Sequence, residues 1–132
     1  MRNLLAVATL ALVACDSSIE PDTIQGTYTL ATINNQGMPY LIFADATGRL
    51  EVLGGRITLR PDLTFEDVLE TRVVNGGTEG RFTTTDGGAY SMVGPDHALL
   101  DPADPSFASY TVTLEDGALS YTDETRLWRY RK

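Results

Sequence analysis

The feature that most constrains the fold is the regular spacing of turn sequences from Gly26 onward. Short runs rich in β-branched and aromatic residues end at turns containing Gly, Asn or Asp, and no helical period of useful length separates them. The runs are 27–33, 39–43, 49–60, 63–74, 80–85, 89–93, 109–114, 118–121 and 126–131. Asn-Gly and Asp-Gly supply the positive φ of tight hairpin turns. The pattern predicts an all-β protein, an antiparallel meander that closes into a small barrel of about eight strands.

Apolar residues recur at every second position within these runs, which assigns one face of each strand to the interior. The inward set is Tyr28, Leu30, Ile57, Leu59, Leu63, Phe65, Tyr110, Val112, Leu114, Leu119, Tyr121, Trp128 and Tyr130. In the run 49–60, the apolar residues before Gly54 occupy even positions and those after Gly55 occupy odd positions. A β-bulge at Gly54-Gly55 would reconcile the two halves, so we predict one there, with a bend in the strand.

The first residues have the character of an export signal. One positive charge, Arg2, precedes an apolar stretch over residues 4–14, which is shorter than the roughly 20 residues that span a bilayer as a helix. The sequence LVAC at residues 12–15 resembles the lipobox of bacterial lipoproteins. The resemblance implies that residues 1–14 are removed and that lipidated Cys15 anchors the chain to a membrane. The alternative is a buried N-terminal helix.

Charge restricts the partners. Removal of residues 1–14 leaves 9 basic and 18 acidic side chains, a net charge of −9. Such a surface repels nucleic acid and anionic lipid headgroups, so we expect no nucleic-acid binding and membrane contact through the lipid alone. Residues 15–23 then form a short linker to a domain at 24–132, monomeric and facing the periplasm. In the lipoproteins that this signal region resembles, an aspartate directly after the cysteine implies retention in the inner membrane, as Asp16 would here, and the choice between inner and outer membrane stays open.

Four segments carry a family resemblance: GTYTLATINNQGMP, GGRITLRPDLTF, GRFTTT and the final RLWRYR. They resemble bacterial lipocalin-like domains, which implies a closed barrel that binds a small apolar or amphipathic ligand. Leu63 stands where the family has a turn glycine. The family packs a late arginine across the aromatic residue of the first strand, which implies Arg129 or Arg131 over Tyr28. The alternative for these arginines is a cationic pocket for a carboxylate or phosphate.

A barrel of this size can be filled by its own side chains or can hold one small ligand. Because the strands are short and many inward residues are large rings, we predict a small pocket near one mouth and not a deep cavity. The candidate ligand-binding residues are Tyr28, Tyr110, Tyr121, Trp128 and Tyr130. The alternative is a filled barrel whose loops or open edge contact an envelope protein.

Several other residues can be interpreted either as functional or as ordinary parts of the structure. His97 beside Asp96 lacks a nucleophile elbow, so we expect a surface-loop histidine and no enzyme. Asp96, Asp101 and Asp104 could hold calcium, but they also suit ordinary turns, and we expect no metal or cofactor. Residues 94–106, the longest irregular segment, could be a lid over one mouth or a passive connection. The even positions 66, 70 and 72 should form a solvated face.

Overall fold

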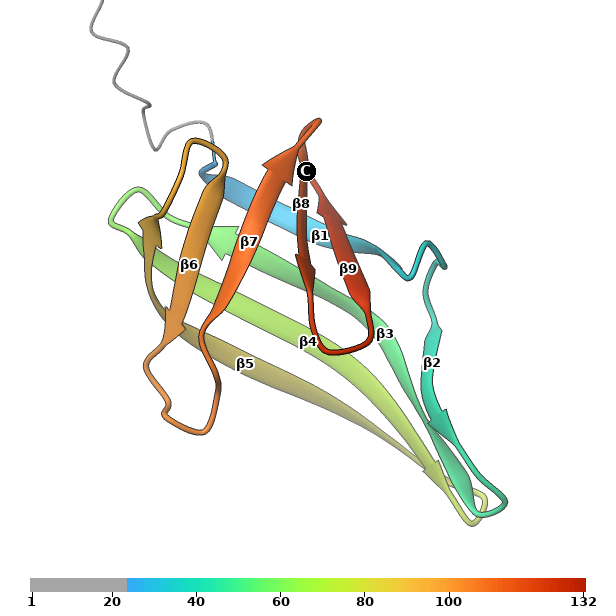
Figure 1. The fold of residues 1–132 in the computed structure, drawn as a ribbon. Coiled ribbons are helices and arrows are strands. Elements are labelled where there is room, and N and C mark those ends of the chain that lie inside the picture. Colours follow the sequence, from blue (N-terminus) through green and yellow to red (C-terminus); the bar gives the residue numbers. More distant parts are fainter. Residues whose placement is uncertain (1–23) are drawn as a thin grey trace, which may run out of the picture.

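Nine strands and no helix make up the regular structure of residues 24–132, the part of the chain that the computed structural model describes (Figure 1). The strands are β1 (Gly26–Ile33), β2 (Tyr40–Ala44), β3 (Gly48–Leu59), β4 (Thr64–Asn75), β5 (Thr78–Met92), β6 (His97–Pro102), β7 (Tyr110–Glu115), β8 (Ala118–Thr122) and β9 (Leu127–Arg131). All pairings are antiparallel, which confirms the predicted all-β meander. The predicted signal 1–14, Cys15 and the linker 15–23 lie outside the described residues.

The barrel has eight strands, and a ninth is attached to its side. The strands pair in the order β1-β9-β8-β7-β6-β5-β4-β3, and β1 closes the ring by pairing with the C-terminal half of β3. The N-terminal half of β3 pairs instead with β2, which therefore stays outside the ring. No helix among residues 24–132 is long and apolar enough to span a membrane.

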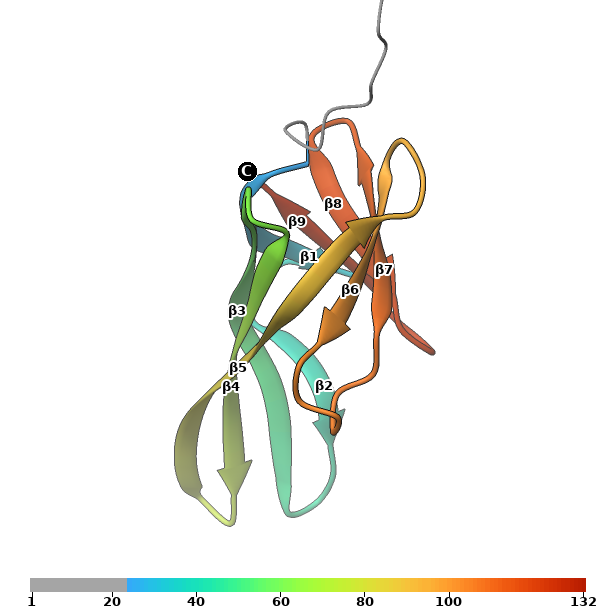
Figure 2. The same ribbon diagram turned by 90° about the vertical axis from the view of Figure 1, so that its left-hand side faces the viewer.

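Three of the strands are much longer than the barrel needs. β6 pairs only with positions 88–92 of β5, so the first half of β5 continues beyond the ring together with β3 and β4. These halves and β2 form an extension that ends in two hairpin tips, seen below the barrel in Figure 2. We call this extension, residues 40–53 and 70–83, the arm.

The register of β3 confirms the predicted change of phase. The pairing of β3 with β4 shifts between Val52 and Gly54, which leaves Leu53 as the extra residue, one position before the predicted Gly54-Gly55. A Cβ atom on Gly55 would lie 2.9 Å from the carbonyl oxygen of Val68. The glycine therefore permits the close approach of β4 at the bend.

Three tight turns form where the sequence predicts them. Both central residues have positive φ at Asn34-Asn35, at Gly76-Gly77 between β4 and β5, and at Asp116-Gly117 between β7 and β8. Positive φ at both central positions matches the twist of the flanking strands.

Two predicted boundaries are wrong. The runs 80–85 and 89–93 predict a turn between them at residues 86–88, but β5 runs straight through this segment. Cβ atoms there would lie 2.9 Å (Gly87) and 2.1 Å (Gly88) from carbonyl oxygens of neighbouring strands, so these glycines serve close strand contact and not a turn. The segment 94–106 was predicted to be irregular, but residues 97–102 form β6, with Ala98 and Leu100 pointing inward.

The interior is packed with the predicted alternating residues. Buried members are Tyr28, Leu30, Ile57, Leu59, Phe65, Val112, Leu119, Trp128 and Tyr130, joined by Ile24, Ile33, Val52, Tyr90, Ala98 and Leu100. Leu63 is a correction, because it is 45% exposed. It occupies a turn with φ of 64°, where its amide donates to the carbonyl of Arg60, so its side chain leaves the inward face.

Candidate functional site

A cavity of about 220 Å³ opens among the barrel strands and the loop 103–109 between β6 and β7. Its lining comes from β4, β5, β7, β8, β9 and that loop: Asp67, Leu69, Thr84, Asp86, Phe107, Ala108, Tyr110, Tyr121 and Tyr130. A cavity of about 150 Å³ accommodates benzene in another protein. The space here therefore suits a ligand somewhat larger than one aromatic ring.

One wall of the cavity is aromatic. Tyr110, Tyr121 and Tyr130 lie at inward positions of three consecutive strands, because each alternates with an outward residue. The Tyr110 and Tyr121 ring centroids are 4.9 Å apart, and those of Tyr121 and Tyr130 are 6.3 Å apart. Phe65 meets Tyr110 edge-on at 6.3 Å. Such contacts hold the rings in fixed orientations.

Another part of the lining carries two carboxylates. Asp67 of β4 and Asp86 of β5 are direct cross-strand partners on the inward face. The Tyr110 hydroxyl donates a hydrogen bond of 2.6 Å to Asp67 Oδ2, and the Gly87 amide donates to Asp86 Oδ1 at 2.7 Å. Like charges placed directly opposite each other in a sheet are destabilising. The Asp67–Asp86 pair therefore lowers the stability of the fold, and packing alone does not explain its presence.

The electrostatics of the cavity are negative. Burial raises the pKa of Asp67, and the Asp86 charge adds to this, while the Tyr110 hydrogen bond opposes it. Burial also raises the pKa values of Tyr110, Tyr121 and Tyr130, with a further contribution from the Asp67 charge, so their hydroxyls stay neutral. The carboxylates that form ion pairs within residues 24–132 belong to Glu51, Glu66, Glu79 and Asp96. No basic side chain of the described chain thus neutralises the Asp67–Asp86 pair.

The structure brings together three of the five candidate ligand-binding residues. Tyr110, Tyr121 and Tyr130 line the cavity, whereas Trp128 and Tyr28 do not. The Trp128 ring stacks on Tyr121 at 5.8 Å, and its Nε1 donates to Asp123 Oδ2 at 2.7 Å. Tyr28 is fully buried, and its hydroxyl donates to the carbonyl of Ile24 at 2.7 Å. Trp128 thus supports the aromatic wall, and Tyr28 fills a different part of the core.

The sequence analysis missed both carboxylates. Asp67 alternates with Phe65 and Leu69, so the period of two already placed it inward. Asp86 was missed because residues 86–88 have the sequence of a turn, whereas they belong to β5 and Asp86 lines the cavity. The segment 94–106, a possible lid, contributes no lining residue, and Phe107 and Ala108 just beyond it do so instead.

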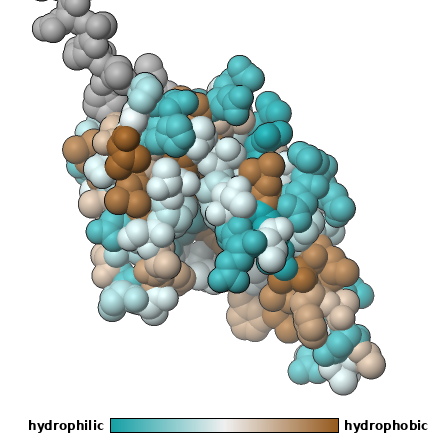
Figure 3. Space-filling model, in the orientation of Figure 1, coloured by the Kyte–Doolittle hydropathy of each residue, from teal (hydrophilic) through white to brown (hydrophobic). Residues whose placement is uncertain are grey.

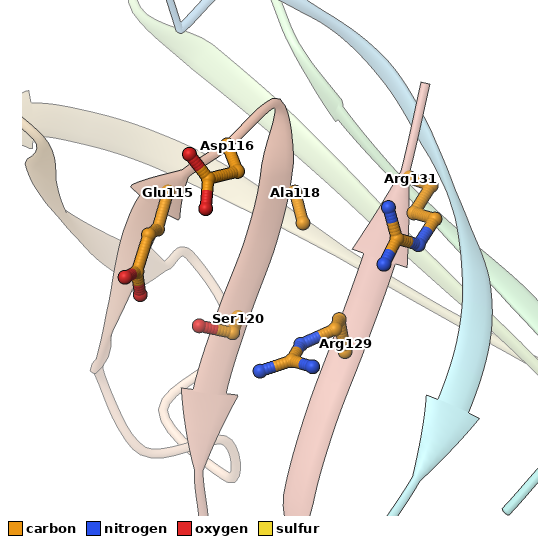
Figure 4. A pocket seen from close by; sticks show the side chains of 6 residues that line it. All are labelled: Glu115, Asp116, Ala118, Ser120, Arg129 and Arg131. Carbon is orange, nitrogen blue, oxygen red and sulfur yellow. The ribbon is translucent and has the colours of Figure 1, made fainter. Parts of the chain in front are cut away.

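The C-terminal arginines lie on the outer surface. Arg129 and Arg131 border a hollow of about 160 Å³ whose other lining residues are Glu115, Asp116, Ala118 and Ser120 (Figure 4). The predicted packing of one arginine over Tyr28 is wrong, because alternation with Trp128 and Tyr130 turns both arginines outward. Lys132 takes that place, with Nζ 5.3 Å from the Tyr28 ring centroid. Two carboxylates balance the charge of the two arginines, so the hollow has no clear preference for an anion.

The other candidate residues, His97 and the three aspartates near it, form polar contacts with residues close to them in the chain. Asp96 pairs with Nδ1 of His97, Asp101 accepts from Ser109 Oγ at 2.7 Å, and Asp104 accepts from the amide and hydroxyl of Ser106. Hydrogen bonds between an aspartate and residues close to it in the chain are common in turns and loops. Across residues 24–132, no group of three or more His, Cys, Asp or Glu side chains is arranged to hold a metal ion.

No protein-family model matches the chain, and no curated protein matches its sequence. The fold therefore provides the classification: a small, closed, eight-stranded antiparallel β-barrel with one extra strand, consistent with a lipocalin-like barrel.

Proposed function

We propose that this protein binds a compact amphipathic molecule in the cavity beside Tyr110, Tyr121 and Tyr130. The observation that carries the proposal is the contrast within the barrel. Most inward residues form a packed core, whereas the side of the interior next to loop 103–109 holds a cavity of about 220 Å³. The role is binding without catalysis.

The lining of the cavity supports a ligand site over a packing defect. Two carboxylates, three tyrosines and Thr84 border it, beside apolar Leu69 and Phe107. Polar groups are costly in a dry core without partners, so residual core space is normally lined by apolar side chains. Ligand sites, in contrast, combine apolar walls with a few placed polar groups.

Partial filling of the cavity tests this proposal. Thr84→Phe places a ring at the cavity lining, whereas Thr85→Phe places the same ring on the outward face of β5. We expect wild type and Thr85→Phe to bind a neutral apolar dye such as Nile red, and Thr84→Phe to bind at least tenfold more weakly. Trp128, the only tryptophan, reports binding through its contact with Tyr121. If the dye, fatty alcohols, isoprenoids and small aromatic amines all leave its emission unchanged, the proposal fails.

We further propose that the barrel is held at a bacterial cell envelope by lipid on Cys15, facing the periplasm. The support is the LVAC sequence at the end of a short apolar segment. Cells fed a labelled fatty acid should transfer the label to the wild-type protein and not to Cys15→Ser, which should accumulate as a precursor. Secretion of an unlabelled, free wild-type protein would contradict this localisation.

A second candidate function is favoured by the arm. Phe43 and Phe82 are 56% and 57% exposed there, on the side that continues the barrel interior. In Figure 3 an apolar patch covers the arm at the lower right. Exposed apolar patches of this kind mark interaction sites, so we propose, as the alternative, that the arm engages an envelope protein. Phe43→Thr with Phe82→Thr should then abolish the association in cells while ligand binding in the barrel is retained.

A further inference from the structure

The charge of the cavity restricts its ligand more than the shape does. Asp67 and Asp86 face each other across β4 and β5, and no cation within residues 24–132 pairs with either. The tyrosine hydroxyl on Asp67 satisfies one oxygen, and the Gly87 amide satisfies one oxygen of Asp86. The remaining acceptor capacity of both carboxylates is available to a donor that enters the cavity.

The aromatic part of the lining also favours positive charge. The faces of aromatic rings attract cations within about 6 Å, and the attraction grows as the site is removed from water. Tyr110, Tyr121 and Tyr130 border the same space as the two carboxylates. Leu69 and Phe107 supply an apolar surface beside them.

We infer that the ligand is a compact organic cation, a primary or secondary amine that carries an apolar ring or short chain. This inference rests on the proposed function. The ammonium group would lie between Asp67 and Asp86 and donate to their free oxygens, and the apolar part would lie against Leu69, Phe107 and the tyrosine rings. An anionic lipid of similar size would be repelled by the same carboxylates.

A metal ion is a poorer match than an amine. Hard divalent cations prefer six or more oxygen ligands, including several from carboxylates or carbonyls. The cavity offers two carboxylates, and much of its lining is aromatic or aliphatic. An amine satisfies both parts of the lining at once.

Three probes of closely similar size separate charge from shape: 2-phenylethylamine, 2-phenylethanol and phenylacetate. Calorimetric titration of the purified protein near pH 7.5 should show the amine binding at least tenfold more tightly than the alcohol, with no detectable binding of phenylacetate. Asp67→Asn and Asp86→Asn should each weaken amine binding at least fivefold and leave alcohol binding within twofold. Glu70→Gln removes the same charge from the outward face of β4 and should change neither affinity.

The outcomes are distinguishable. Equal affinity for the amine and the alcohol, or tighter binding of phenylacetate, overturns the inference while the proposed binding function stands. Failure of all three probes and of the neutral dyes overturns both. A loss of amine binding in Glu70→Gln as large as that in Asp67→Asn would show long-range attraction by net charge and would also overturn the inference. Thermal melting of each variant establishes that it is folded, and Asp86→Asn provides the test if Asp67→Asn is not.

Discussion

Leu63 shows how a single residue can be held in a conformation that its side chain disfavours. Its φ of 64° is in the left-handed region. Two backbone hydrogen bonds keep it there: the Leu63 amide donates to the Arg60 carbonyl, and the Tyr90 amide donates to the Leu63 carbonyl. Leucine has no local polar group to compensate for this conformation, unlike asparagine or aspartate. The lipocalin-like pattern has glycine at this turn, which fits the backbone.

We therefore predict that Leu63→Gly raises the free energy of unfolding by about 0.5–1 kcal/mol, because relief of strain outweighs the greater freedom of glycine in the unfolded chain. The leucine side chain is substantially exposed, so little burial is lost. Leu63→Ala keeps the Cβ atom and should bring no such gain. Urea denaturation measures both changes, and an equal gain in the alanine variant would contradict the strain explanation.

Asp67 predicts a specific pH dependence of stability. Its pKa is raised in the folded state, chiefly by burial, so the folded protein binds a proton at this carboxyl more readily than the unfolded chain. Ionisation of Asp67 thus destabilises the fold as the pH rises from about 3.9, the ordinary pKa of aspartate, through the raised value. The penalty is complete once the pH lies well above the raised pKa of Asp67.

Asp67→Asn should then raise the free energy of unfolding at pH 7 by up to about 1 kcal/mol, since it removes a like-charge contact with Asp86 and keeps an acceptor for Tyr110. The difference from wild type should disappear below about pH 3.5, where the wild-type carboxyl is protonated in both states. Denaturant titrations at both pH values provide the measurement. A variant less stable than wild type at pH 7 would show instead that the carboxylate is structural.

At the scale of elements, β5 is the strand that organises both the barrel and the arm. It pairs with β4 over residues 78–89 and with β6 over residues 88–92, near its C-terminal end. Where all three strands meet, Gly88 faces the Asp101 carbonyl so closely that a Cβ would lie 2.1 Å away. The register between β4 and β5 places Asp86 directly across from Asp67, two residues before this close contact.

Gly88→Ala should therefore force β5 and β6 apart and lower the free energy of unfolding by about 1–3 kcal/mol, the range found for overpacked sites. Gly94→Ala is the matched control, because its added Cβ would meet only the His97 side chain at 3.5 Å or more. We expect the control to change stability by less than about 0.5 kcal/mol. Thermal melting distinguishes the two, and similar small effects would mean that the strands can separate without cost.

At the scale of the whole molecule, ring closure depends on residues far apart in the chain. Residues 26–29 of β1 pair with 56–59 of β3, while the other edge of β1 pairs with β9. Trp128 is 6% exposed because it lies inside this closed ring, against Ile33 and Tyr121. Its fluorescence therefore reports on the closed barrel.

We predict that Trp128 emission and the far-ultraviolet β-sheet signal change together in one cooperative transition during urea denaturation. Ile57→Ala in the closing seam, where the side chain is fully buried, should move both transitions to lower urea by the same amount, equivalent to about 2–4 kcal/mol. Exposure of Trp128 before the sheet signal is lost would show that the ring opens separately.

Much of the fold could be predicted because its determinants are local. A period of two decides which side of a strand is apolar, and positive-φ residues such as Gly76, Gly77 and Gly117 decide where the chain can turn. The apolar residues of β3 move from even to odd positions around Gly54, which requires a bulge whichever strand pairs with β3. The all-β meander, the bulge in β3 and the inward tyrosines Tyr110, Tyr121 and Tyr130 follow from such rules.

What only the tertiary structure decided depends on which strand lies across from a residue. Glycines at 87 and 88 have the composition of a turn, but neighbouring carbonyls make them sites of close strand contact. The opposition of Asp67 and Asp86 and the placement of Lys132 over Tyr28 arise from pairing and packing between separate segments. The sequence by itself determined the all-β class, most of the inward positions and three tight turns, but not β6 or the continuity of β5. The register of closure, and with it the charged cavity, was decided by contacts between residues far apart in the chain, which no local period encodes.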